Sequence, residues 1–173
     1  MFSLTFHKSE KDQIFYKDKD KAVAWFELQI GNFTANMLCV YYGKNFNIHY
    51  KEKFSYLLDD LSEYILDWLQ AITKLNENNN ICYLLYEYDD QSTNWIKCEL
   101  HGDILEMQAG WSTLDGIGYD ALYDAKKFRR PDLEELKSNN KFAVTSVPDF
   151  NPISEKFIFE RKVIVAQMEN IKF

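Results

Sequence analysis

The sequence has few glycines and prolines and no long apolar run. Its 173 residues include 6 glycines and 3 prolines, which argues against several domains joined by linkers. No stretch approaches the ~20 apolar residues of a membrane-spanning helix. The first residues, MFSLTFHKSEKD, lack the basic region and apolar run of a secretory signal. We therefore expect one globular domain over residues 1–173 that works in the cytoplasm, with no membrane partner.

Cysteine is also scarce, and the three cysteines form no recognisable motif. Cys39, Cys82 and Cys98 are odd in number and include no CxxC pair. Such residues are typically small buried hydrophobic side chains of a protein in a reducing compartment. Cys82 and Cys98 could face each other across two strands, where a disulfide is possible but free thiols are the favoured interpretation.

Basic residues are outnumbered by acidic ones. The chain has 20 Lys and Arg against 27 Asp and Glu, a formal net charge of -7, and its sequence pI is near 5.0. Phosphate binding needs a basic surface, so we expect no nucleic-acid partner. An acidic surface suits a basic protein partner, although ordinary solubility is the simpler account of the charge.

The motifs of known enzymes and metal sites are missing. Three histidines lie far apart, with no HxxxH or HxH pair: His7, His49 and His101. There is no GxSxG, and no glycine-rich loop is completed by the Lys-Ser/Thr of a phosphate site. Asp115, Asp120 and Asp124 lack the alternation and closing Glu of a calcium loop. We expect no catalytic residue, no metal and no cofactor.

Aromatic residues, in contrast, are abundant, and one helical signal dominates. The chain contains 13 Phe, 11 Tyr and 4 Trp, ample material for a packed core. The longest periodic stretch runs from Lys51 to Leu75 and contains no Gly or Pro. Its apolar residues have the three-then-four spacing of one helix face: Phe54, Leu58, Leu61, Ile65, Trp68, Leu69 and Ile72. We predict a long amphipathic helix with a sheet packed against it.

Alternating apolar residues predict the strands of that sheet. The predicted strands are residues 2–6, 22–30, 33–42, 81–88, 94–100, 104–111 and 142–147, the last of these being the final strand. Gly31 and Asn32 both tolerate positive φ and predict a two-residue hairpin turn. Turns at 89–93 and 101–103 make the three middle strands a meander. Residues 112–140 are expected to form a loop and short helices.

The C-terminal segment fits two periods. The apolar residues at positions 157, 164, 165 and 168 share a helix face, whereas those at 157, 159, 163 and 165 alternate as in a strand. We choose a helix over residues 155–171, with Ser154 as its N-cap. The predicted fold class is α+β: an antiparallel sheet of meander and hairpins, packed against the long amphipathic helix and a C-terminal helix.

Acidic and aromatic residues are interleaved from the end of the 81–88 strand onward. Carboxylates steer a basic partner, and Trp and Tyr side chains provide buried anchors. An equally weighted alternative places the aromatic residues in the core and the acids at the solvated surface. The hypothetical partner-binding residues are Glu87, Asp89, Asp90, Asp103, Glu106, Trp111, Asp115, Tyr119, Asp120, Tyr123 and Asp124.

In its order of elements the chain resembles the small cytosolic immunity proteins of bacterial polymorphic-toxin and contact-dependent growth inhibition systems. The likeness begins at the hairpin AWFELQIGNFTANMLCVYY and continues through the amphipathic helix and the aromatic meander to the closing segment. It lies in organisation, so it carries over no binding residue. The resemblance implies a non-enzymatic protein that binds and blocks a cognate toxin. That toxin would often be a nuclease, and nuclease toxins tend to be basic.

Two other functions stay open from the residues alone. One is a small carboxylate-dependent enzyme acting through the region of residues 103–124. The other is a scaffold module that binds a protein other than a toxin. Surface occlusion of a basic toxin is the leading hypothesis.

Overall fold

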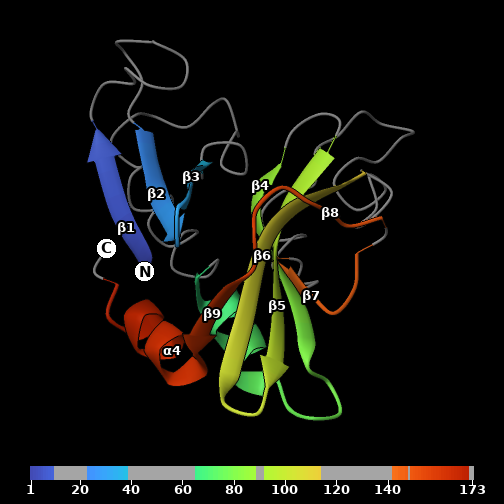
Figure 1. Ribbon diagram of the computed structural model, residues 1–173. Helices are drawn as coiled ribbons and strands as arrows, with labels where there is room; N and C mark the ends of the chain where they lie inside the picture. Colours follow the sequence, from blue (N-terminus) through green and yellow to red (C-terminus); the bar gives the residue numbers. More distant parts are fainter. Residues whose placement is uncertain (10–22, 39–64, 89–91, 114–141, 148, 172–173) are drawn as a thin grey trace.

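The computed structural model describes residues 1–9, 23–38, 65–88, 92–113, 142–147 and 149–171. These residues form antiparallel sheets and helices, which confirms the predicted α+β class (Figure 1). The strands are divided between two sheets, whereas the sequence suggested one. In the described part of the chain, no helix is long and apolar enough to cross a membrane.

The first sheet has the strand order β1-β2-β3. Its strands are β1 (Phe2–Ser9), β2 (Val23–Ile30) and β3 (Phe33–Leu38). Along β2, Phe26 and Leu28 are fully buried while Glu27 between them is exposed, so only one face of the sheet meets the core. Gly31 has a φ of 61° in the two-residue turn between β2 and β3, which confirms the predicted hairpin. The remainder of the predicted 33–42 strand lies outside the described residues.

The second sheet has the order β7-β4-β5-β6-β8, with β9 also paired to β6. Its strands are β4 (Ile81–Tyr88), β5 (Ser92–His101), β6 (Ile104–Thr113), β7 (Ala143–Val144), β8 (Asn151–Pro152) and β9 (Phe157–Glu160). The predicted meander is confirmed, and its last two strands are longer than expected. Ser92 and Thr93 belong to β5, so the turn predicted at 89–93 is wrong at these two residues.

A helix lies behind the β4–β6 meander (Figure 1). Residues 65–74 are helical, and Ile65, Trp68 and Ile72 on one side of this helix are buried. The indole Nε1 of Trp68 donates a hydrogen bond of 3.2 Å to the Leu85 carbonyl, which fixes the helix against β4. The predicted 51–75 helix is thus confirmed over its C-terminal part, and residues 51–64 lie outside the described residues.

The prediction for residues 142–147 is wrong in two respects. Only Ala143–Val144 forms a strand there, and β8 and β9 follow it in the chain. The short strand lies beside β4, where Leu84 pairs with Ala143. The contact with β4 extends beyond these two residues. Phe142 is buried in the core, and its carbonyl accepts a hydrogen bond from the Leu85 amide.

The predicted helix over 155–171 is only half right. Residues Phe157–Glu160 form β9, and the helix α4 (Arg161–Glu169) begins after them. Ser154 is not the N-cap: its Oγ accepts a hydrogen bond from the Ala109 amide, and Glu160 occupies the N-cap position. Residues 157–160 become a strand because β6 offers them an edge along residues 104–107. Figure 1 shows α4 next to β1, at the lower edge of the first sheet.

Two of the three cysteines lie opposite each other in the second sheet. Cys82 on β4 pairs directly with Cys98 on β5, and both are buried free thiols. Burial raises the pKa of the Cys98 thiol, and the neighbouring Cys82 thiol raises it further through a hydrogen bond and its charge. The interpretation of these residues as small buried hydrophobic side chains is confirmed, and Cys39 lies outside the described residues.

Candidate functional site

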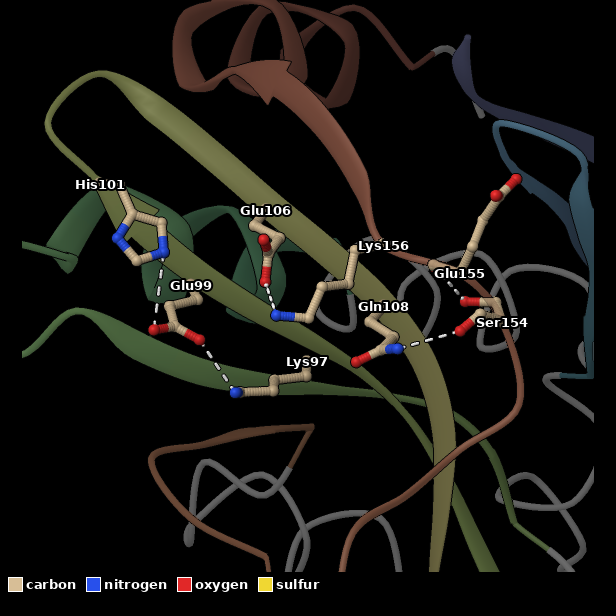
Figure 2. Close-up of polar contacts among 8 residues, drawn as sticks. All are labelled: Lys97, Glu99, His101, Glu106, Gln108, Ser154, Glu155 and Lys156. Atoms are coloured by element: carbon tan, nitrogen blue, oxygen red, sulfur yellow. Dashed lines mark hydrogen bonds and ion pairs between the residues drawn. The ribbon is translucent and has the colours of Figure 1, made fainter.

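The outer face of the second sheet carries a compact group of ionisable side chains from β5 and β6. Along β5, Ile96, Cys98 and Leu100 are buried in the core. The alternating residues between and after them, Lys97, Glu99 and His101, therefore project from the opposite face. Figure 2 shows these three residues together with Glu106 and Gln108 from β6 and Lys156 from the segment before β9.

The strand register places two carboxylates side by side. The two-residue turn at Gly102 and Asp103 sets His101 opposite Ile104, and it therefore sets Glu99 opposite Glu106. Like charges directly opposite each other on a sheet destabilise it, so the pair needs neighbouring positive charge.

Two lysines supply that charge. The Lys97 ammonium lies 2.9 Å from Glu99 Oε2, and the Lys156 ammonium lies 2.6 Å from Glu106 Oε1. The His101 imidazole approaches the same group, with Nε2 at 3.5 Å from Glu99 Oε1 (Figure 2). The carboxylates are about four-fifths shielded from solvent, with 21% of each side chain exposed. The group is therefore a charge-balanced network in a partly shielded setting.

These contacts shift the protonation equilibria in the expected directions. The hydrogen bond from Lys97 is the main cause that lowers the pKa of Glu99. Burial opposes it, and the charges of Lys97, His101 and Lys156 lower the pKa further. The hydrogen bond to Glu106 and the charge of that carboxylate raise the pKa of Lys156. Both shifts favour the charged forms that the network pairs.

The last part of the network depends on the chain after β8. Gln108 Nε2 donates a 3.0 Å hydrogen bond to the Ser154 carbonyl, and the Ala109 amide donates to Ser154 Oγ at 2.9 Å. These bonds hold residues 153–156 along β6, which brings Lys156 over Glu106. Ser154, which was predicted to cap a helix, instead helps to position the Lys156 ammonium group.

The network also has the composition of a metal site. Ligand atoms of Glu99, His101 and Glu106 all lie within 4.8 Å of one another. Motif spacing missed this group because the three residues come from two strands. The signal that could have found it is the turn at Gly102 and Asp103, since a two-residue loop fixes which residues face each other.

A second group lies at the opposite end of the same strands. Asn94 on β5 pairs with both Glu87 on β4 and Trp111 on β6. Its side-chain amide donates a 3.1 Å hydrogen bond to Glu87 Oε2. Trp111 is 37% exposed, a large fraction for a tryptophan in a sheet. We call Glu87, Asn94 and Trp111 the tryptophan corner.

The structure distributes the predicted partner-binding residues between these two places. Glu87 and Trp111 belong to the tryptophan corner, whereas Asp103 and Glu106 lie at the hairpin end of β5 and β6. At about 3.3 Å per strand residue, the two ends are roughly 20 Å apart. Seven predicted residues lie outside the described part of the chain: Asp89, Asp90, Asp115, Tyr119, Asp120, Tyr123 and Asp124.

Comparisons with known proteins give little further information. Neither a protein-family model nor a curated protein matches the chain. Among solved structures, the chain is similar to one described as a CdiA-CT/CdiI toxin and immunity complex from Enterobacter cloacae, at 10% identity and a TM-score of 0.47. The match covers 98% of this chain and 97% of that chain. A likeness at this TM-score carries no argument about function.

Proposed function

We propose that the protein is an immunity protein that binds and neutralises a cognate protein toxin, acting in the cytoplasm and catalysing no reaction. The expected toxin is a basic, nuclease-type domain whose active site or binding surface is occluded. The order of elements that suggested this function is supported by the confirmed hairpin and meander. The observation that carries the proposal is the tryptophan corner, where the exposed Trp111 and the hydrogen-bonded Glu87 carboxylate lie on the two strands that flank Asn94, on a chain of net charge -7.

The chemistry of the corner fits a protein partner of opposite charge. Tryptophan is among the residues that contribute most to binding when an interface buries them, because it adds a large rigid apolar area. The hydrogen bond from Asn94 limits the positions of the Glu87 carboxylate, so less side-chain freedom is lost on binding. The net negative charge of the whole chain raises the rate of encounter with a basic partner.

Co-expression with the product of the gene immediately upstream tests the function. We expect that product to kill or arrest bacteria when expressed alone, and growth to be restored when this protein is also present. A product that is harmless alone, or that still kills in the presence of this protein, overturns the immunity proposal. A stable complex with a harmless neighbour would instead favour a scaffold module.

Two surface variants test the corner itself. Trp111→Ala is expected to speed dissociation of the complex, and Glu87→Lys to slow association at low salt. The matched control is Glu77→Lys, which makes the same charge change at an exposed residue before β4, at the other end of that strand. If Glu87→Lys and Glu77→Lys slow association equally, the effect is one of net charge. If Trp111→Ala also leaves dissociation unchanged, the corner is not the binding surface.

A further inference from the structure

We propose that Glu99, His101 and Glu106 bind one divalent first-row transition-metal ion, with zinc as the representative ion. The three side chains project from the outer face of β5 and β6, and their ligand atoms lie within 4.8 Å of one another. This inference concerns the protein alone. Its outcome is therefore independent of whether the chain neutralises a toxin.

The two glutamates and the histidine have oxygen and nitrogen atoms available for a metal ion. Glu99 uses Oε2 for its contact with Lys97, which leaves Oε1 on the side of His101 Nε2 at 3.5 Å. Glu106 uses Oε1 for its contact with Lys156, which leaves its second oxygen for another ligand. One carboxylate oxygen from each glutamate and the imidazole nitrogen can therefore turn toward a shared centre while the backbone stays in its strands.

The ligand atoms are already close to the separation that a bound metal requires. In a tetrahedral zinc site with bonds of about 2.1 Å, neighbouring ligand atoms are about 3.4 Å apart. Ligand atoms that already lie within 4.8 Å need to approach by roughly 1 Å or a little more, which rotation of two glutamate side chains provides. Three protein ligands leave the fourth position for water.

The charge of the two glutamates also favours a divalent cation. Glu99 and Glu106 are direct cross-strand partners, and a divalent ion between them relieves their repulsion more strongly than a single ammonium group. The imidazole selects the class of metal, because nitrogen ligands favour zinc and its neighbours, whereas magnesium and calcium favour oxygen. We therefore expect zinc to bind and magnesium not to compete with it.

Lys97 and Lys156 compete with a metal ion for the two carboxylates. Replacing one of these lysines is therefore the sharpest test of the proposed site. Lys156 is 55% exposed and its ammonium lies 2.6 Å from Glu106 Oε1, so its positive charge opposes a cation bound at the other oxygen of that carboxylate. Replacing Lys156 by Met removes one positive charge a few ångströms from the ion. We expect this change to tighten zinc binding about fivefold or more. If the group were only a salt-bridge network, Lys156→Met would create no metal affinity.

The experiment is a titration of the full chain with zinc, read out by calorimetry or by competition with a coloured chelator, and repeated with cobalt(II) for its visible absorption. We expect each of three variants to weaken zinc binding at least tenfold: His101→Gln, Glu99→Gln and Glu106→Gln. Even residues that only hydrogen-bond to a metal ligand contribute that much to metal affinity. All three side chains lie on the outer face, so the variants should fold, and circular dichroism verifies this.

Two matched controls come from the same molecule. His7 also lies beside a carboxylate, with Nε2 at 3.3 Å from Glu27 Oε2, but it belongs to a different sheet, so His7→Gln should leave zinc binding unchanged. Lys162 is paired with Glu160 at 2.7 Å, so Lys162→Met makes the same charge change as Lys156→Met without freeing Glu106. Zinc affinity that is equal in the wild type, His101→Gln and Glu106→Gln overturns the proposal. An equal response to Lys156→Met and Lys162→Met also overturns it.

Discussion

Gly31 packs closely against the aromatic ring of Phe157. The glycine forms the turn between β2 and β3, whereas the phenylalanine begins β9 in the other sheet. A Cβ atom on Gly31 would collide with the Phe157 ring. The turn therefore needs glycine for two reasons, a φ of 61° and the close approach of a side chain from the second sheet.

Gly31→Ala is expected to destabilise the fold by about 2–5 kcal/mol, the sum of the cost of positive φ and of overpacking. Gly102→Ala is the matched control, because Gly102 has a φ of 62° with nothing within 4 Å of the added methyl. It should cost only about 1–2 kcal/mol. Urea unfolding gives both free energies. Equal losses would show that the Phe157 ring moves aside without cost.

Trp68→Phe should lower the free energy of unfolding by about 1–3 kcal/mol. The change removes the hydrogen bond to the Leu85 carbonyl and leaves a void in a fully buried position. Trp111→Phe serves as control and should cost about 1 kcal/mol or less, since Trp111 is 37% exposed. A small effect at Trp68 would mean that the 65–74 helix contributes little to the core.

The sequence predicted the hairpins well because the information that specifies them is local. Alternation along β2 marks its buried face, and Gly31 and Gly102 identify turns in which positive φ is required. The segment from Phe157 to Ile171 could not be resolved in the same way. Its apolar residues fit both periods, and the deciding factor is the free edge of β6, which only the assembled sheet provides.

The candidate metal site also combines a local feature that the sequence can predict with a long-range contact that it cannot. The pairing of Glu99 with Glu106 could be worked out from the turn at Gly102 once that turn was recognised. The position of Lys156 could not, because it depends on the pairing of β9 with β6 and on the bonds made by Ser154. The spacing of residues along the sequence does not predict such long-range contacts.

Cys82 and Cys98 are expected to resist thiol reagents in the native protein. Both are buried, and the raised pKa of Cys98 leaves little thiolate to react. The measurement is the rate of reaction with a chromogenic disulfide in a Cys39→Ser variant, at about pH 8 where an ordinary thiol reacts readily. Both thiols should become reactive in denaturant. Rapid reaction without denaturant would show that the β4–β5 pair opens easily.

Acid is expected to remove the stability that Glu99 contributes. Its pKa is lowered from the ordinary value of 4.5, chiefly by the hydrogen bond from Lys97. A carboxyl with a lowered folded-state pKa contributes stability that is fully present above its unfolded value. That stability is lost as the pH falls through the folded value. The free energy of unfolding of Glu99→Gln should therefore differ from that of the wild type most at neutral pH and least well below pH 4.5.

Lys97→Met tests the cause of this effect. The variant removes the ammonium group that accounts for most of the lowered pKa of Glu99, so its stability should fall less steeply with acidification than that of the wild type. Urea unfolding at a series of pH values measures both variants. A constant difference between wild type and Glu99→Gln at every pH would mean that the side chain acts through packing and not through its charge.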